Sequence, residues 1–249
     1  MAGILYLVPN LLEQAAASSG AALAGVIPET VQATTARLEY FIAENAKTTR
    51  AFLKLLGQAR PLAKPLQEIR IAGLDVNTPA DALPGLLAPI LAGQDGGLIS
   101  EAGVPAVADP GANLVRLAHE RGIRVKPLVG PSSLLLALMA SGLNGQRFAF
   151  HGYLPVDAAE RARRIKALEE RSRQEHQTQL FIETPYRNLT LLQALASACR
   201  PQTLVSVATD LSLPDEWVRT QSAERWKRDL EQGKEPPFHK RPTVFLMLA

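Results

Sequence analysis

The segment Leu98–Gly111, with the sequence LISEAGVPAVADPG, constrains the fold of this chain more than any other. A short apolar run typical of a buried strand passes into a loop of small residues, and a helical pattern follows. Open α/β sheets bind ligands at such points, where the carboxyl end of a strand meets a loop. Gly103 and Gly111 allow the backbone to approach a ligand closely or to take a positive φ. Glu101 and Asp109 suit a cationic or hydroxyl-rich ligand better than a free phosphate.

Strand-like and helix-like segments alternate through the first half of the chain. We expect strands at 4–8, 38–43, 98–100 and 123–129, and helices at 47–56, 78–92, 113–121 and 131–141. The alanine-rich residues 11–36 are expected to be partly helical. Thr78 and Pro79 are interpreted as an N-cap and a first helical residue, and Gly57, Gly122 and Gly142 as helix ends. This alternation predicts a mainly parallel sheet.

The second half of the chain has a different rhythm. We expect strands at 147–151, 179–183, 204–208, 216–219 and 243–248, and helices at 157–173 and 188–198. Short links between the later strands indicate hairpins and therefore a mixed sheet. The fold class is therefore α/β, with an N-terminal domain at 1–129 and a C-terminal domain at 130–249.

Composition narrows the class of protein. The 249 residues carry a net charge of +3, which permits a nucleic-acid partner without requiring one. Cys199 is the single cysteine, so no intramolecular disulfide can form, and we expect a cytoplasmic protein. The four histidines lack ligand-like spacing, so no metal is expected. No apolar run reaches the roughly 18 residues of a membrane span, and the start lacks the basic region of a signal peptide.

Six blocks, in order and at matching spacing, carry a resemblance to a known family. They are 98–105 (LISEAGVP), 108–111 (ADPG), 122–125 (GIRV), 127–133 (PLVGPSS), 147–155 (RFAFHGYLP) and 181–187 (FIETPYR). The chain thereby resembles the tetrapyrrole methylase superfamily of S-adenosylmethionine-dependent methyltransferases. Within it, the chain is similar to the branch of 16S ribosomal RNA cytidine 2′-O-methyltransferases, as a sister group. That branch usually has TPIGNL and EDTR where this chain has PNLLE at 9–13 and ENAK at 44–47.

The resemblance implies a homodimer of two-domain subunits with S-adenosylmethionine in a cleft between the domains. The residues it assigns to the cofactor are Pro9, Ser100, Glu101, Ala102, Gly103, Val104, Val107, Asp109, Ser132, Ser133, Phe150, Glu183, Thr184 and Pro185. From this placement we expect Gly103→Val to crowd the cofactor and leave the fold intact.

Methyl transfer to a hydroxyl is helped by a general base. Glu101, Glu183 and His151 are the candidates, and none belongs to a recognisable dyad, so the base stays unassigned. Each site residue also has a structural alternative. Glu101 can cap its loop, Asp109 can cap the following helix, and His151 can be a packed, hydrogen-bonded histidine. Ser132 and Ser133 are expected to cap the helix that they open.

The basic helix at 157–173 allows two interpretations. Its arginines alternate with glutamates, which favours a solvated, salt-bridged face. RNA contact is the alternative, with Arg164 and Arg187 as candidate substrate-binding residues.

We therefore expect a methyltransferase that acts on the ribose of ribosomal RNA, with the small subunit as a partner. The alternatives are a methyltransferase for a tetrapyrrole or another small molecule, and a non-catalytic module that binds S-adenosylmethionine or RNA.

Overall fold

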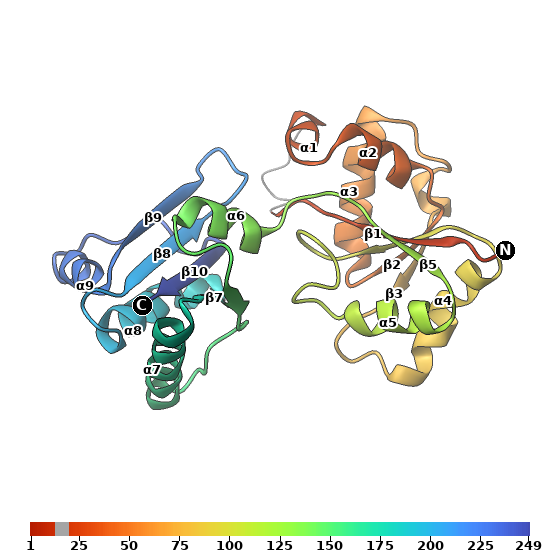
Figure 1. Cartoon of the computed structure of the whole chain (residues 1–249). Helices are drawn as coiled ribbons and strands as arrows, with labels where there is room; N and C mark the ends of the chain where they lie inside the picture. The colour runs from red at the N-terminus through yellow and green to blue at the C-terminus, as the bar shows by residue number, and fades with distance from the viewer. Residues whose placement is uncertain (13–19) are drawn as a thin grey trace. The chain divides into compact units, whose positions relative to one another are not determined.

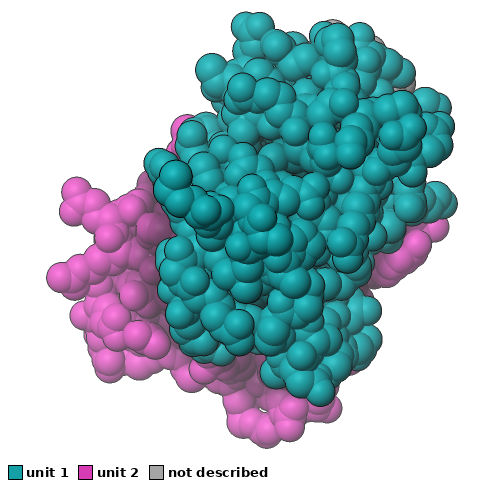
Figure 2. Space-filling view, turned by 90° about the vertical axis from the view of Figure 1, so that its right-hand side faces the viewer, with its two compact units in different colours: residues 1–132 teal, residues 133–249 magenta. Residues whose placement is uncertain are grey.

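The computed structural model describes residues 1–12 and 20–249 (Figure 1). These residues form two compact units, Met1–Ser132 and Ser133–Ala249, which Figure 2 shows in different colours. The sequence places the domain boundary slightly earlier, after residue 129. Within the described ranges, no helix has both the length and the apolar character needed to cross a membrane.

The first unit is built on a parallel sheet. Its strands are β1 (Ile4–Val8), β2 (Tyr40–Ala43), β3 (Arg70–Gly73), β4 (Gly96–Ile99) and β5 (Arg124–Pro127), in the order β3-β2-β4-β1-β5. Every neighbouring pair is parallel. β2 and β4 are buried along their whole length, as expected of strands covered on both faces. The parallel sheet that the alternating pattern predicts is therefore confirmed.

Helices cover both faces of this sheet. One face packs against α1 (Gly20–Val26), α2 (Glu29–Ala36) and α3 (Ala46–Ala59), with the short turn η1 (Leu66–Glu68) beside them. The other face packs against α4 (Leu83–Leu91), which follows the turn η2 (Ala80–Ala82), and against α5 (Ala112–Glu120). Figure 1 shows these two groups of helices on opposite sides of the strands.

The strand order creates a switch point at the centre of the sheet. From β1 the chain crosses toward β2, whereas from β4 it crosses past β1 to β5 at the edge. The connections after these neighbouring strands therefore leave in opposite directions. Ligands of open α/β sheets bind outside the carboxyl ends of the strands at such a point.

Three details of the first unit differ from the prediction. α3 continues through Gly57 and ends at Ala59, because the next residue, Arg60, is extended before Pro61. Thr78 does not cap a helix, since its hydroxyl accepts from the backbone N–H of Asp75 at 2.9 Å. β3 was not expected, because this edge strand is short and largely exposed and lacks a clear apolar pattern.

The second unit has a mixed sheet, as predicted. Its strands are β6 (Phe148–Phe150), β7 (Thr178–Glu183), β8 (Leu204–Thr209), β9 (Trp217–Ser222) and β10 (Thr243–Leu248), in the order β6-β7-β10-β8-β9. β6 and β7 are parallel, and the other pairs are antiparallel. The register places Glu183, Thr243 and Thr209 in one row, where β7 and β8 end.

The helices of this unit enclose the sheet. α7 (Ala158–Glu175), α8 (Asn188–Ala198) and α9 (Ala223–Glu231) bury one face around Phe181, Trp226 and Phe245. α6 (Ser133–Ser141) packs against β8, β9 and β10. The short turn η3 (Pro185–Arg187) joins β7 to α8. α9 was not expected from the sequence, although Ser222 caps it by accepting from the backbone N–H of Arg225.

Candidate functional site

Asn10 fastens the loops that follow β1 and β4 to each other. Its side-chain Nδ2 donates to the carbonyls of Ser100 at 3.0 Å and Glu101 at 3.1 Å. Its backbone N–H donates to the carbonyl of Gly103 at 2.8 Å. Asn10 is fully buried, and its bond to Ser100 forms away from water. Asn10, in the loop after β1, therefore holds the loop after β4 in a fixed position at the switch point.

The backbone of the loop after β4 takes conformations that side chains usually avoid. Gly103, Ala106 and Ala108 have φ values of 70°, 66° and 62°. Left-handed alanines carry a steric cost, and such residues cluster at functional sites. A second tight spot lies nearby, because a Cβ on Gly130 would come within 2.1 Å of Pro9. The loops here are built from small residues, because the backbone is left-handed or closely packed at these positions.

The expectation that Gly103→Val leaves the fold intact is wrong. A branched side chain at a φ of 70° is strained, and its Cβ would lie 3.2 Å from Leu12 and 3.4 Å from the carbonyl of Pro131. The variant would disturb the loop as well as any ligand, so other variants are needed to test this site.

Three carboxylates gather at the ends of β2 and β4. Glu44 follows β2, and Glu101 and Asp109 lie in the loop after β4. Asn45 orients Glu101, because its Nδ2 donates to Glu101 Oε1 at 2.7 Å while its own Oδ1 caps α3. The partner of Glu101 Oε1 is therefore a side-chain amide, whereas a loop-capping carboxylate would accept from the loop backbone. The three acids create negative potential at the switch point.

The electrostatics of the cluster raise two pKa values. Burial raises the pKa of Asp109 to about 6, and the charges of Glu44 and Glu101 add to this, against a hydrogen bond from Ser100. Burial and the neighbouring Glu101 also raise the pKa of Glu44. Asp109 does not cap α5, whose N-cap position is Gly111 without a side-chain bond. The site thus has unsatisfied negative charge that a cation would stabilise.

A small, open depression lies beside these acids. Its lining includes Glu44, Ser100, Asp109 and the left-handed Ala106. Its floor is formed by the buried residues Leu98 and Ile99 of β4 and by neighbouring apolar atoms.

The first unit thus brings together Pro9, Ser100, Glu101, Ala102, Gly103, Val104, Val107 and Asp109 in the loops after β1 and β4. Ser132 and Ser133 lie where the two units join in sequence, and α6 begins at Ser133. Sequence reasoning missed Asn10, Glu44 and Asn45. Their signal was their position directly after predicted strands, inside the two segments that depart from the similar branch.

In the second unit, an ion pair lies where β7 ends. Glu183 Oε1 accepts from Arg187 Nη2 at 2.6 Å, from Arg187 Nε at 3.0 Å and from the backbone N–H of Thr184 at 2.7 Å. The Glu183 side chain is 4% exposed and the Arg187 side chain 33%. Thr184 and Pro185 continue this turn, and Phe150 ends the parallel strand β6 beside β7. These residues form a second cluster at the edge of their own sheet.

His151 is held against the core of the second unit. Its Nε2 lies 2.6 Å from Gln179 Oε1, and its ring stacks on the buried Phe181 at 5.8 Å between centroids. Burial lowers the pKa of His151, and the nearby positive charges of Arg164 and Arg171 lower it further, while the Gln179 bond opposes them. This geometry favours the packed, hydrogen-bonded histidine over the catalytic base.

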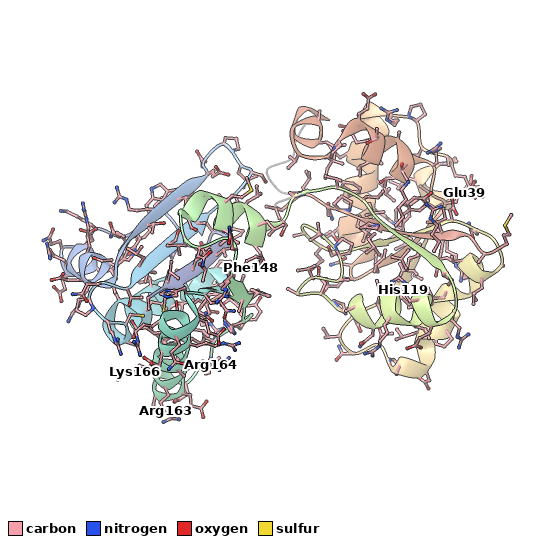
Figure 3. The ribbon with its side chains drawn as sticks, in the orientation of Figure 1. Glu39, His119, Phe148, Arg163, Arg164 and Lys166 are labelled. Atoms are coloured by element: carbon pink, nitrogen blue, oxygen red, sulfur yellow. The ribbon has the colours of Figure 1, made fainter. Side chains whose placement is uncertain are left out.

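The basic helix α7 carries both paired and unpaired cations. In its last turns, Arg171 pairs with Glu175 and Arg173 pairs with Glu170. Nearer its start, Arg163, Arg164 and Lys166 are exposed and have no carboxylate partner among the residues described. Figure 3 shows these three side chains along the helix. The buried Arg161 instead donates to the backbone carbonyls of Pro155 and Val156.

Over residues 1–12 and 20–249, no group of three or more His, Cys, Asp or Glu side chains has the arrangement of a metal site.

Comparison with known proteins gives the family. The model of the "Tetrapyrrole (Corrin/Porphyrin) Methylases" matches residues 19–225. The chain belongs to the tetrapyrrole methylase family. The resemblance carried by the six sequence blocks is thereby confirmed.

Two relatives in this family are called "Ribosomal RNA small subunit methyltransferase I". The protein of Mesorhizobium japonicum is 34% identical over 187 residues, which are 75% of this chain and 59% of the relative. The protein of Escherichia coli O157:H7 is 32% identical over 210 residues, which are 84% of this chain and 66% of the relative. The matched part of this tetrapyrrole methylase thus spans less than two thirds of either relative's length.

A solved structure agrees in fold. The uroporphyrin-III C-methyltransferase of Thermus thermophilus, complexed with S-adenyl homocysteine, has a TM-score of 0.55 at 15% identity and covers 99% of this chain and 97% of its own. The expected two-domain α/β architecture of a tetrapyrrole methylase is thereby confirmed.

Proposed function

We propose that this tetrapyrrole methylase is an S-adenosylmethionine-dependent methyltransferase that acts on ribosomal RNA, at a ribose 2′-hydroxyl. The observation that carries the proposal is the cluster of Glu44, Glu101 and Asp109 at the switch point of the parallel sheet. Carboxylates whose charge is unneutralised suit a ligand that is itself a cation. The relatives named as ribosomal RNA small subunit methyltransferases support RNA as the acceptor.

The small residues in the loops of the first unit also support this cofactor. Glycine at 103 and 130 and left-handed alanines at 106 and 108 keep the loops free of bulky side chains. The residues that would hold the cofactor come from four places in the chain. The loop after β4 supplies Ser100, Glu101, Ala102, Gly103, Val104, Val107 and Asp109. Pro9 follows β1, Ser132 and Ser133 follow β5, and the second unit supplies Phe150, Glu183, Thr184 and Pro185. The bound cofactor supplies a methyl group that its positive sulfur already activates.

The protein's part in such a reaction is positioning. Asn10 fixes the loop, and Asn45 fixes the Glu101 carboxylate, so these groups need little reorganisation. Of the three candidate bases, Glu101 is exposed and oriented, whereas Glu183 is neutralised by Arg187 and His151 is bonded to Gln179. Glu101 is therefore the group that we propose to accept the hydroxyl proton.

Positive charge on the second unit supports the RNA acceptor. Arg164 lies among the free cations of α7, whereas Arg187 is paired with Glu183 at the end of β7, and its side chain is 33% exposed. We keep both as substrate-binding residues. Of the two, Arg164 has no carboxylate partner among the described residues and can neutralise a phosphate directly.

We also propose that the protein works as a homodimer in the cytoplasm, with the small ribosomal subunit as its partner. Leu135 and Met139 support a dimer, because they lie one turn apart on α6 and are 52% and 78% exposed. The single cysteine fits a reducing compartment.

The first experiment is calorimetric titration with S-adenosylmethionine and, separately, with S-adenosylhomocysteine. Micromolar binding of either supports the cofactor. Methyl incorporation into small ribosomal subunits from cells that lack this modification then tests the acceptor, and the modified nucleoside shows whether the methyl is on the ribose. Glu101→Gln should lower the rate of methyl transfer by a larger factor than it lowers the affinity for the cofactor.

Different results would favour the alternatives. Binding of the cofactor with methyl transfer to a tetrapyrrole and none to ribosomal particles would replace the acceptor. Binding without transfer to any of these would indicate a non-catalytic module. Absence of binding would overturn the proposal at its base.

A further inference from the structure

Tyr186 and Lys240 form an exposed pair beside the end of β7. Tyr186 lies in η3, and its side chain is 78% exposed. The Lys240 ammonium lies 5.7 Å from the centre of the Tyr186 ring. Lys240 is itself exposed, so most of this aromatic surface and its cation are in contact with water. A large aromatic ring presented to solvent in this way contributes little to the core.

The backbone that presents Lys240 is held firmly. Lys240 has a φ of 57°, a left-handed conformation that is uncommon for lysine. The turn around it is anchored by Asn188, whose Nδ2 donates to the carbonyls of Phe238 and Arg241, both at 2.9 Å. Phe238 is buried, and its ring packs against Phe245 in the core. Buried contacts thus maintain the left-handed backbone of Lys240, and this conformation places its ammonium group at the surface.

The neighbouring arginines are already neutralised. Arg187 is paired with Glu183, and Arg241 donates to Asp210 at 2.9 Å. Lys240 has no carboxylate partner among the described residues, and its contact is the Tyr186 ring. The pair therefore offers one free positive charge and one flat aromatic face to a ligand.

We infer that Tyr186 and Lys240 bind an unpaired nucleotide of the RNA acceptor, with a base against the tyrosine ring and a phosphate at the lysine ammonium. This inference rests on the proposed function, because it names the surface that receives the acceptor. Every base has a flat face, and exposed aromatic rings interleaved with cations are the usual platform for single-stranded RNA. Lysine serves such a platform as a point charge for phosphate.

The test measures binding of a fluorescent, unstructured RNA oligonucleotide to the whole protein at several salt concentrations. Tyr186→Ala should weaken binding by about five- to 150-fold, the range for loss of one stacked base. Tyr186→Phe keeps the ring and should bind within about twofold of the wild type. Lys240→Asn keeps a residue that tolerates the left-handed backbone, and it should reduce the slope of log affinity against log salt by about 0.7.

Matched controls separate this platform from general charge and from the cofactor site. Lys126 also lies over a tyrosine ring, 5.8 Å from the centre of Tyr6, but that ring is partly buried. Lys126→Gln should leave the salt slope unchanged. Affinity for S-adenosylhomocysteine should be unchanged in both Tyr186 variants, because the ring is assigned to the acceptor.

Three outcomes would overturn the inference. These are wild-type affinity for RNA in Tyr186→Ala, loss of S-adenosylhomocysteine binding in that variant, and no binding of the oligonucleotide by the wild type at low salt. Failure of the proposed function shows up separately, as a wild-type protein that transfers no methyl group to ribosomal particles. If Tyr186→Ala methylates RNA as well as the wild type does, the proposed function stands, but the platform is ruled out.

Discussion

The two units differ in which charged side chains are left without an ion-pair partner at the ends of their strands. In the first unit, Glu44, Glu101 and Asp109 have no ion-pair partner among the described residues, and the pKa values of Glu44 and Asp109 are raised. In the second unit, Glu183 and Asp210 are neutralised by Arg187 and Arg241, while Lys240 has no acid beside it. The first unit thus has acids without a positive partner at this edge, and the second unit has a lysine without a negative partner. This difference supports our proposals of a cationic cofactor on the first unit and a phosphate-bearing acceptor on the second.

The largest test of this contrast is removal of the cation at the second edge. Arg187→Met leaves the Glu183 carboxylate charged and almost fully buried, so we expect the free energy of unfolding to fall by about 3 kcal/mol. Chemical denaturation measures this loss. The double variant Glu183→Gln with Arg187→Met should recover part of the stability, because no buried charge is left unpaired. Equal stability of Arg187→Met and wild type would show that this edge is not self-neutralised.

The next test loosens the loop of the first edge. Asn10→Ala leaves the carbonyls of Ser100 and Glu101 without their donor, and we expect the free energy of unfolding to fall by about 2 kcal/mol. Affinity for S-adenosylhomocysteine should fall at least about tenfold by calorimetry, since 1.4 kcal/mol is one decade. Asn77→Ala, at an exposed loop position, is the control and should change neither quantity. Unchanged cofactor affinity in Asn10→Ala would place the cofactor elsewhere.

A smaller effect tests the charge of the first edge directly. As the pH rises through about 6, Asp109 ionises, and affinity for the cationic S-adenosylmethionine should increase by about fivefold. Affinity for the neutral sulfur of S-adenosylhomocysteine should change less. Asp109→Asn should remove the difference between the two ligands, whereas Glu120→Gln, at an exposed acid of α5, should keep it. A pH dependence that persists in Asp109→Asn would assign the titration to another group.

The same variant has a predicted stability profile. Folding raises the pKa of Asp109 from 3.8 to about 6, so the folded state binds its proton more tightly than the unfolded state. Stability contributed by this group is complete below about pH 4 and is lost as the pH rises through about 6. Asp109→Asn should therefore have a higher melting temperature than wild type at pH 7, and the gain should vanish near pH 4. A constant difference between the two proteins would contradict this.

The smallest expected effect is the difference in RNA affinity between removing an unpaired and a paired arginine of α7. Arg164→Ala should weaken RNA binding by about two- to fivefold at low salt, because Arg164 has no described carboxylate partner. Arg173→Ala, whose guanidinium is occupied by Glu170, should change RNA affinity less. Equal effects of the two substitutions would mean that α7 contributes only its overall charge.

The strands and helices of this chain were largely predictable because their patterns are local. β1 matches its predicted range of residues 4–8, and α8 matches 188–198. Gly122 and Gly142 follow their helices with φ values of 68° and 69°, as helix-terminating glycines do. Gly57 failed as a helix end because its helix continues until Pro61 makes residue 60 extended. Neighbouring residues decide such features, so a single sequence is sufficient.

The candidate site was less predictable because its bonds join distant segments. Asn10 contacts residues 90 and 91 positions away, and Asn45 contacts Glu101 across 56 positions. No local pattern shows that an asparagine after one strand will fasten the loop of another. Glu101 and Asp109 could be named because a glycine-rich loop surrounds them, whereas Glu44 joins them only through the pairing of β2 with β4.

The position of β10 has a consequence for synthesis on the ribosome. β10 lies between β7 and β8 and pairs with both, yet it follows every other strand of its sheet in the chain. While the chain emerges residue by residue, β7 and β8 can have no common neighbour until residues 243–248 appear. The first unit can complete its sheet once β5 has emerged. The nascent chain therefore exposes the unpaired apolar edges of β7 and β8 from the time that β8 has emerged until β10 appears, and chaperone protection is needed most in this interval.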